Sequence, residues 1–276
     1  MRTFGSEAGT YLYLNGLATN RTVRLSDQVE LLPASADCNA DLFLSLGKSD
    51  IDISVISLFL PQVTSQLKVT GNDAKDTAIR AWNAVWDGLL LGALIGAEVM
   101  CNIQSEVRAE ELTPESTVAV TNYHLRGLSR GTPVALTEAD ISWIESNYEK
   151  ALTLLDNESF QNAAHCLASY RWHSMPRARL AILWSGIEGL FGVESEIVFR
   201  VSLYTARFLE PHDNARQREV FGRVKELYKL RSKAVHGGRM KGNANEGVDE
   251  SASLLRTLVR RCAELGSMPN LEGLVP

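Results

Sequence analysis

The residues best suited to acid–base chemistry lie near the end of one predicted helix, residues 215–236. Its apolar stripe consists of Val220, Val224, Leu227, Tyr228 and Val235. Arg231 follows Val224 by seven residues, so it projects within about 20° of Val224, in line with the core-facing side. An unpaired buried guanidinium would cost several kcal/mol. Arg231 therefore requires an anion or a half-open cleft.

Glu188 is the anion that the chain itself offers to Arg231. It lies between Trp184 and Phe191 in the apolar segment 180–191, where it is the only charged residue. In one interpretation the two residues form a buried structural pair. In the other, Arg231 faces a cleft and holds a phosphate, and Glu188 orients its guanidinium.

His236 adds a group that can move a proton. It follows Arg231 by five residues, which is about 140° around a regular helix. Gly237 and Gly238 come next and permit the helix to end, which frees the imidazole to point toward the same cleft. This combination suits cleavage of an RNA phosphodiester without a metal or cofactor. The histidine acts as general base on the 2′-hydroxyl or as acid for the leaving oxygen, and the arginine stabilises charge on the phosphorane.

The HEPN superfamily, in particular its Apea-like members, is the family that two runs of this sequence resemble. The runs appear in the family's order within residues 137–268, and two separate motifs agree. They are Leu180-Ala-Ile-Leu-Trp184-Ser-Gly-Ile-Glu188-Gly-Leu-Phe191 and Tyr228-Lys-Leu-Arg231-Ser-Lys-Ala-Val-His236-Gly237.

This resemblance implies an α-helical bundle that forms a homodimer, with the motif arginine and histidine lining a cleft at the dimer interface. Many HEPN members are metal-independent endoribonucleases of defence, toxin or stress systems, and Apea-like members include abortive-infection proteins that act against phage. By this resemblance Arg231 and His236 are the catalytic pair, and Tyr228 and Lys233 position RNA. Active members often carry Asn, Asp or His after the arginine. Here Ser232 stands in that place, and its hydroxyl can still donate a hydrogen bond to phosphate.

Two other functions stay open. Some HEPN domains cleave nothing and act as dimerisation or sensing modules, in which case Arg231 is locked in a structural pair. A third interpretation is a module that binds nucleotides or RNA without cleavage, and it predicts thermal stabilisation by nucleotide that Arg231→Ala abolishes. If the protein is the ribonuclease, the N-terminal half is the sensor or regulator, with a trigger derived from phage or a nucleotide.

The N-terminal domain, residues 1–130, is predicted to mix strands and helices. Recurrence of apolar residues at three and four positions predicts a helix over residues 73–98, in which Trp82 and Trp86 pack the core. Period-2 alternation and β-prone residues predict strands over residues 10–15, 23–31, 51–55, 99–107 and 117–125, the last two as a hairpin.

The C-terminal domain, residues 137–268, is predicted to be all-α, so the chain as a whole is α+β. Residues 126–133 are typical of a linker, and Gly237 to Gly247 of a flexible connection. Thr137 and Asp140 match a helix-capping pattern. Helices are expected over residues 137–155, 160–170, 176–191, 194–210, 215–236 and 248–265.

Composition narrows the class of protein but does not identify a function. The chain has 276 residues, 45% hydrophobic and 22% charged, which is typical of a globular protein. Residues 1–125 hold 8 Lys and Arg against 15 Asp and Glu, whereas residues 200–241 hold 11 against 4. The basic stretch is either a solvated helix face or a cradle for a phosphate backbone, and the acidic half is a candidate shield for that cradle.

The remaining signals predict a cytoplasmic protein with no membrane partner. The start of the chain lacks a secretion signal, and the longest apolar stretch, residues 89–97, is too short to span a bilayer. The four cysteines form no CxxC pair and indicate core thiols rather than a metal site. His165 and His173 flank Tyr170-Arg171-Trp172, a cluster that either stacks bases or ends a helix. His124 and His212 are interpreted as structural and solvated, respectively.

Overall fold

The structure, a computed structural model, describes residues 3–123, 132–238 and 244–274. The chain forms two compact units, Met1–Glu149 and Lys150–Pro276. The first contains an antiparallel sheet with helices and the second is helical, so the predicted α+β class is confirmed at this level. Most of the predicted linker, His124 and the centre of the predicted Gly-rich connection lie outside the described residues.

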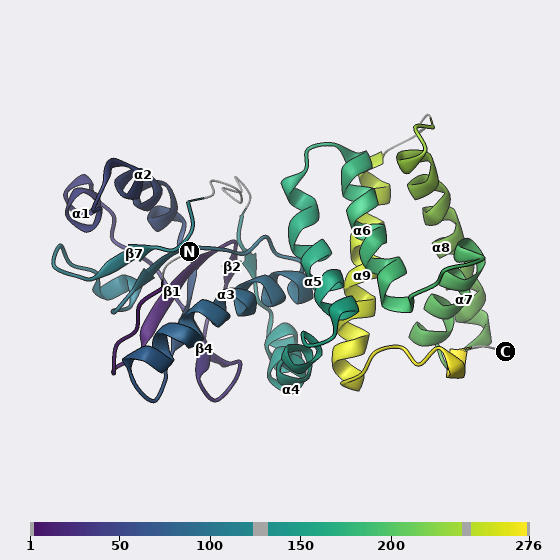
Figure 1. Cartoon of the computed structure of the whole chain (residues 1–276), viewed down its shortest axis with the longest axis horizontal. Helices are drawn as coiled ribbons and strands as arrows, with labels where there is room; N and C mark the ends of the chain where they lie inside the picture. Colours follow the sequence, from purple (N-terminus) through teal and green to yellow (C-terminus); the bar gives the residue numbers. More distant parts are fainter. Residues whose placement is uncertain (1–2, 124–131, 239–243, 275–276) are drawn as a thin grey trace. The chain divides into compact units, whose positions relative to one another are not determined.

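The sheet of the N-terminal unit has the strand order β3-β4-β5-β1-β6-β7, and all neighbours are antiparallel (Figure 1). Its central strand β1 pairs with β5 on one side and β6 on the other, so that Leu12 lies opposite both Leu67 and Gln104. The strands are β1 (Thr10–Asn15), β3 (Val23–Arg24), β4 (Val29–Pro33), β5 (Ser65–Val69), β6 (Met100–Ser105) and β7 (Val118–Val120).

Helices cover both faces of this sheet. Tyr13 of β1 belongs to the apolar cluster that α1 (Ala40–Leu46) and α2 (Asp50–Phe59) form on one face. The next residue, Leu14, faces α3 (Ala74–Ile95), where a Cβ added at Gly88 would lie 3.6 Å from its Cδ2. Alternation along the strand thus divides the core between two layers of helix.

Three of the predicted N-terminal elements are confirmed. The strand over residues 10–15 is β1, and the helix over residues 73–98 is α3. The predicted hairpin is formed by β6 and β7, with Ser105 opposite Val118, although β7 is shorter than expected.

The predicted strand at residues 51–55 is wrong, because this segment lies in helix α2. Ser49 caps the helix by accepting from the backbone of Asp52 at 3.2 Å, and its buried residues Val55, Ile56 and Phe59 follow helical spacing. The predicted strand at 23–31 is two strands, β3 and β4. A turn between them places the Ser26 hydroxyl against the backbone N–H of Val29 at 3.2 Å.

Other expectations fail where side chains face solvent. Trp82 and Trp86 do not pack the core, since they are 47% and 36% exposed, and α3 buries Ala81, Ala84, Leu91 and their neighbours instead. Cys38 is exposed, unlike the other three cysteines. Helix α1 and strand β5 have no counterpart among the predicted elements.

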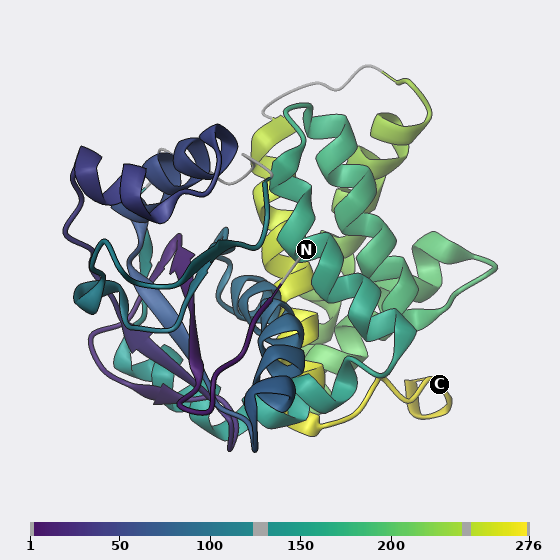
Figure 2. The ribbon, with the colours of Figure 1, turned by 60° about the vertical axis from the view of Figure 1, so that its left-hand side comes forward.

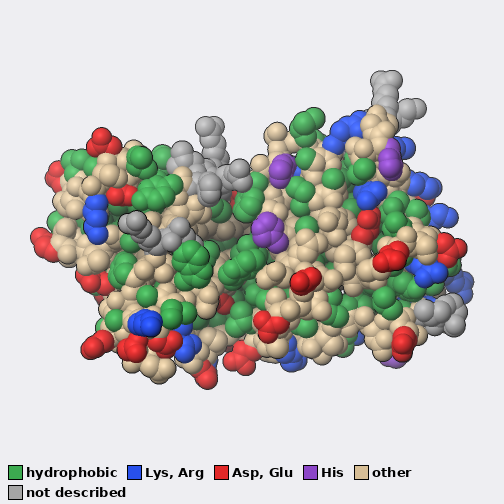
Figure 3. All heavy atoms as spheres, in the orientation of Figure 1, with side chains coloured by type: hydrophobic (Ala, Val, Ile, Leu, Met, Phe, Trp, Pro, Cys, Tyr) green, Lys and Arg blue, Asp and Glu red, His purple; other side chains and the backbone are tan. Residues whose placement is uncertain are grey.

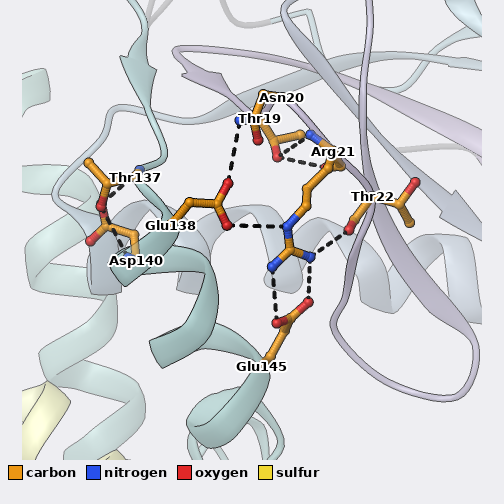
Figure 4. A network of polar contacts seen from close by, with 8 residues as sticks. All are labelled: Thr19, Asn20, Arg21, Thr22, Thr137, Glu138, Asp140 and Glu145. Carbon is orange, nitrogen blue, oxygen red and sulfur yellow. Dashed lines mark hydrogen bonds and ion pairs between the residues drawn. The ribbon is translucent and has the colours of Figure 1, made fainter.

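Helix α4 (Glu138–Leu154) begins as predicted at a capping box. The Thr137 hydroxyl accepts from the Asp140 N–H at 3.1 Å, and the Asp140 carboxylate accepts from the Thr137 N–H at 3.1 Å (Figure 4). Arg21 also forms two ion pairs with this helix. Its Nη1 lies 2.8 Å from Glu145, and its Nε lies 3.5 Å from Glu138 (Figure 4). Ahead of α4, β8 (Val134–Ala135) pairs in parallel with β2 (Leu17–Ala18).

These contacts extend the N-terminal unit beyond the boundary expected from the sequence. Tyr148, near the end of α4, donates to the Asp87 carboxylate of α3 at 2.5 Å. The units therefore divide inside α4, after Glu149, rather than at the predicted linker between domains 1–130 and 137–268.

The C-terminal unit packs its helices around α6 (Pro176–Phe191), which contacts α5, α8 and α9 (Figure 2). Pro176 is the first residue of α6, as predicted. The other helices are α5 (Glu158–Ser169), α7 (Ile197–Leu209), α8 (Asn214–Val235) and α9 (Ala244–Leu265). Helix α9 starts four residues earlier than expected. None of the described helices combines the length and the apolar composition that a membrane span requires.

Candidate functional site

Arg231 of α8 and Glu188 of α6 form an ion pair. Nη2 of the guanidinium donates to Oε2 of the carboxylate at 3.1 Å, while Nε lies 3.0 Å from Oε1 without the alignment of a hydrogen bond. The two side chains are 21% and 20% exposed. The pair considered from the sequence is therefore present, and it lies at the edge of the core rather than in its centre.

The environment of Glu188 disfavours its charge. Burial raises the pKa of the Glu188 carboxyl above its ordinary value, and the nearby Arg231 guanidinium offsets only part of that rise. The attraction between the two charges is thus smaller than the cost of removing the carboxylate from water. An ion pair of this kind contributes little to folding.

One aromatic side chain contacts Arg231, and a second packs against the first. Its guanidinium carbon lies 5.3 Å from the centre of the Tyr228 ring, one turn earlier on α8. The Tyr228 ring meets Trp184 of α6 edge-on with centroids 5.2 Å apart, and the indole N–H donates to Ser251 of α9 at 3.1 Å. Arg231 thus contacts Tyr228 directly, and side chains of α6 and α9 hold the Tyr228 and Trp184 rings.

The end of α8 is held by Arg177, in the first turn of α6. Its Nη1 donates to the carbonyls of Lys233 and Ala234, both at 3.1 Å, and its Nη2 donates to the carbonyl of Gly238 at 2.6 Å. The Lys233 and Ala234 carbonyls are ones that a helix end leaves without backbone partners, and the positive charge opposes the negative end of the helix dipole. Gly237 has φ +74, a left-handed conformation that turns the chain away from the helix.

No motif in the sequence singles out Arg177. Its role depends on which helix end lies beside the start of α6, and no spacing in the sequence reveals this. The only local signal is its position next to Pro176, in a helical first turn where a cation is otherwise unfavourable.

His236 occupies the position after the last residue of α8, as predicted. Its backbone N–H closes the helix by donating to the Ser232 carbonyl at 3.0 Å. Its side chain is exposed and makes no hydrogen bond or ion pair with any described residue. Lys233 is likewise exposed, and Ser232 is half-buried.

The predicted site residues therefore fall into two groups. Arg231, Glu188 and Tyr228 are in mutual contact at the edge of the core. His236 and Lys233 lie in solvent at the end of α8, and no hydrogen bond or ion pair joins His236 to Arg231. The last turns of α8 thus hold the two components of the predicted chemistry apart, with Arg231 at the edge of the core and His236 in solvent.

The second cluster of interest, around Trp172, is ordered by its own contacts. The rings of His165 and Trp172 meet edge-on at 6.1 Å, and the Arg171 guanidinium lies 4.6 Å from the Tyr170 ring centre. Arg179 donates to the His173 carbonyl at 2.5 Å. The end of helix α5 thus accounts for these residues, as one of the two interpretations expected.

Known proteins do not identify the site. Comparison of the chain with protein-family models, with curated proteins and with solved structures gives no match. Within the described ranges, no group of three or more His, Cys, Asp or Glu side chains is arranged to hold a metal ion. The chemistry of α8 is therefore the basis for any functional conclusion.

Proposed function

We propose that this protein is a metal-independent endoribonuclease of the HEPN type, acting as a homodimer in bacterial anti-phage or stress defence. The observation that carries the proposal is the end of α8, where an exposed imidazole follows a fixed guanidinium by five residues. The resemblance of the two motif runs to Apea-like HEPN domains supports the same conclusion.

The energetics of the Arg231–Glu188 pair favour a functional role for the arginine. Since burial raises the pKa of Glu188 despite its partner, the pair is a poor stabilising device. A guanidinium held by an aromatic ring and a carboxylate, yet 21% exposed, is preorganised to accept a second anion. A phosphate oxygen is such an anion, and guanidinium binds it strongly.

The roles follow from the chemistry of each side chain. His236 takes the proton of the ribose 2′-hydroxyl or gives one to the leaving 5′-oxygen, and Arg231 stabilises the charge that develops on the phosphorus centre. Glu188 and Tyr228 orient Arg231, while Lys233 and Ser232 contact the phosphate backbone. Arg177 positions His236 by fixing the end of α8. A second copy of α8 across a dimer interface completes the site, and the N-terminal unit regulates it in response to a phage-derived or nucleotide trigger.

The test is cleavage of total cellular RNA and of tRNA in the presence of EDTA. His236→Ala removes the general acid–base group and should lower the rate by about 10²–10⁴-fold. His212→Ala is the matched control, because His212 is also exposed but lies in the turn before α8. It should cleave like the wild type.

Equal loss in both variants, or cleavage that survives in His236→Ala, would count against the assignment of His236. A wild type that cleaves nothing in EDTA, alone or with phage lysate as trigger, would remove the ribonuclease proposal. A growth assay under phage challenge with the same two variants tests the defence role.

The ion pair itself favours a second candidate, a non-catalytic dimerisation or RNA-binding module. In that case Arg231 serves to hold α8 against α6, and His236 has no role. Arg231→Ala would then unfold the protein or abolish nucleotide-dependent stabilisation, while His236→Ala would change nothing. If both variants fold and both lose cleavage or toxicity, the ribonuclease is supported instead.

A further inference from the structure

One face of α8 carries basic side chains along its whole length. Taking 100° per residue, Arg218, Lys225, Lys229, Lys233 and His236 fall within an arc of about 80°. All five are exposed. We call Arg218, Lys225, Lys229 and Lys233 the basic stripe. It extends about 27 Å along the helix from Arg218 to His236.

No acidic residue of α8 lies within the arc of the stripe. The other α8 residues within this arc are Ala215 and Gly222, both neutral, and Glu226 lies about 20° beyond its edge. The acidic residues of α8, Glu219 and Glu226, lie to one side, where they pair with Arg216 at 2.7 Å and with Lys229 at 2.6 Å. Figure 3 shows Lys and Arg side chains, with Asp and Glu among them, over the region of α7 and α8.

Most of the stripe is unpaired. The side chains of Arg218, Lys225 and Lys233 make no hydrogen bond or ion pair with any described residue. By contrast, Arg216 and Arg223 lie about 140–160° around the helix from Arg218. Each of these two is paired, with Glu219 and Glu250 respectively. The helix therefore has a neutralised basic face and a free one.

A hollow of about 380 Å³ lies at the end of the stripe far from His236, between α7 and α8. Arg218 belongs to both the stripe and the hollow. The hollow combines apolar wall, two amides and two guanidinium groups; its lining residues are Leu203, Ala206, Arg207, Asn214, Gln217, Arg218 and Phe221. Phe221 is held by an edge-on contact with Phe199 at 5.9 Å.

We propose that the basic stripe is the track for a single strand of RNA that leads to His236, with one base seated in the hollow beside Phe221. Cations that follow one another along one side of a helix suit the phosphates of one strand, and an aromatic wall suits an unpaired base. A duplex keeps its bases stacked and offers none for the hollow. This inference deepens the proposed function and rests on it for the direction of the track.

The test measures binding separately from cleavage. Fluorescence anisotropy of a labelled oligouridine is followed over a range of salt concentrations, using the full chain with His236→Ala so that the strand stays intact. In this background Arg218→Gln with Lys225→Gln removes two unpaired charges of the stripe. Binding should weaken, and the slope of log K against log salt should become shallower by about 1.4, or about 0.7 per lost phosphate contact.

Arg216→Gln with Arg223→Gln is the matched control. It removes the same charge from the same helix, but from the face where carboxylates already neutralise it. Affinity and slope should stay close to those of the background protein. If this control lowers the slope as much as the stripe variant, binding reports net charge and the track is overturned.

Phe221→Leu tests the hollow. It removes a stacking surface but no charge, so affinity should fall about tenfold while the salt slope is unchanged. An unchanged affinity would overturn the placement of a base there. Tighter binding of a matched duplex through the same stripe would overturn the choice of a single strand.

Failure of the track and failure of the proposed ribonuclease are distinguishable. If the wild type cleaves RNA but the stripe variant keeps its full salt slope, the track is wrong and the ribonuclease stands. If the stripe variant loses slope but the wild type cleaves nothing, strand binding stands and the ribonuclease is wrong.

Discussion

Each of the two units contains a carboxyl group on the inward side of a helix. One has a neutral hydroxyl as its partner, and the other has a guanidinium. Asp87 of α3 is 6% exposed and accepts a hydrogen bond from the Tyr148 hydroxyl at 2.5 Å. Glu188 of α6 is 20% exposed and faces the Arg231 guanidinium. Burial raises the pKa of both carboxyls, and it raises that of Asp87 to about 6.

The two pairs differ in the number of hydrogen-bond donors that the partner keeps for a ligand. A neutral hydroxyl that donates into a closed core ties α4 to α3 and has no further capacity for a ligand. A guanidinium has five N–H donors, and Glu188 uses only part of them at a surface open to solvent. The first pair is therefore a structural contact of the N-terminal unit, and the second is suited to bind an anion.

The largest expected effect is on the pH dependence of stability through Asp87. Its pKa is about 6 in the folded protein against an ordinary 3.8, so the native state binds the proton more tightly between these values. The stability that Asp87 contributes is then present below pH 3.8 and is lost as the pH rises to about 6, by about 3 kcal/mol. Asp87→Asn should remove this dependence.

The measurement is urea unfolding of wild type and Asp87→Asn from pH 3.5 to 7. The unfolding free energy of the variant minus that of the wild type should increase across this window. Asp41→Asn, an exposed carboxyl on α1, is the control and should run parallel to the wild type. A difference between Asp87→Asn and wild type that stays constant with pH would contradict the prediction.

The second effect is the loss of the Arg231 guanidinium. Arg231→Ala leaves the Glu188 carboxylate half-buried without its cation, which should lower the unfolding free energy at pH 7 by about 2 kcal/mol. Adding Glu188→Gln should recover part of that loss, because no charge is then left unpaired. Lys229→Ala, which breaks an exposed pair with Glu226, should cost at most about 0.5 kcal/mol. A cost for Arg231→Ala no larger than this would show that the pair is not partly buried in solution.

The elements that the sequence predicted well carry their own local signals. Helix α4 has a capping box, α6 starts at a proline, and α8 ends before two glycines. Strand β5 has no such signal. Its Ser65 and Gln66 are fully buried, and Gln66 satisfies its amide by donating to the Pro33 carbonyl at 3.2 Å and accepting from the Ala109 N–H at 3.0 Å. These partners are distant in sequence. The polar residues of β5 therefore gave no sign that the segment is a buried strand.

In the candidate site, too, some features follow from local sequence and others depend on how the helices pack. The position of Arg231 on the inward side of α8 followed from helix geometry, and Glu188 was the only acidic residue of the predicted helix over residues 176–191. The contacts of Arg177 with the end of α8 depend on how two helices pack, which no spacing reveals. The same limit applies to the hollow beside Phe221, whose walls come from two helices.

The third effect is the loss of the Tyr148 hydroxyl, which donates to Asp87. Tyr148→Phe removes the donor to Asp87 and leaves a buried carboxyl without that partner, so stability should fall by about 1–2 kcal/mol. The pKa of Asp87 should rise further, because the hydrogen bond now lowers it. Tyr123→Phe is the control, since the Tyr123 hydroxyl donates to Asp52 at 2.9 Å at the surface. Equal losses in the two variants would indicate that Asp87 is solvated.

The smallest effect on stability is expected for a substitution of Glu188 in its pair with Arg231. Glu188→Gln keeps the shape of the side chain and an oxygen that can accept from Arg231, while it removes a charge that burial disfavours. The two changes oppose each other, so stability at pH 7 should change by less than about 1 kcal/mol. The guanidinium loses its counter-charge, however, and should bind oligouridine more tightly in the His236→Ala background. Unchanged affinity together with a large loss of stability would make Glu188 and Arg231 a structural pair and remove the contrast with Asp87.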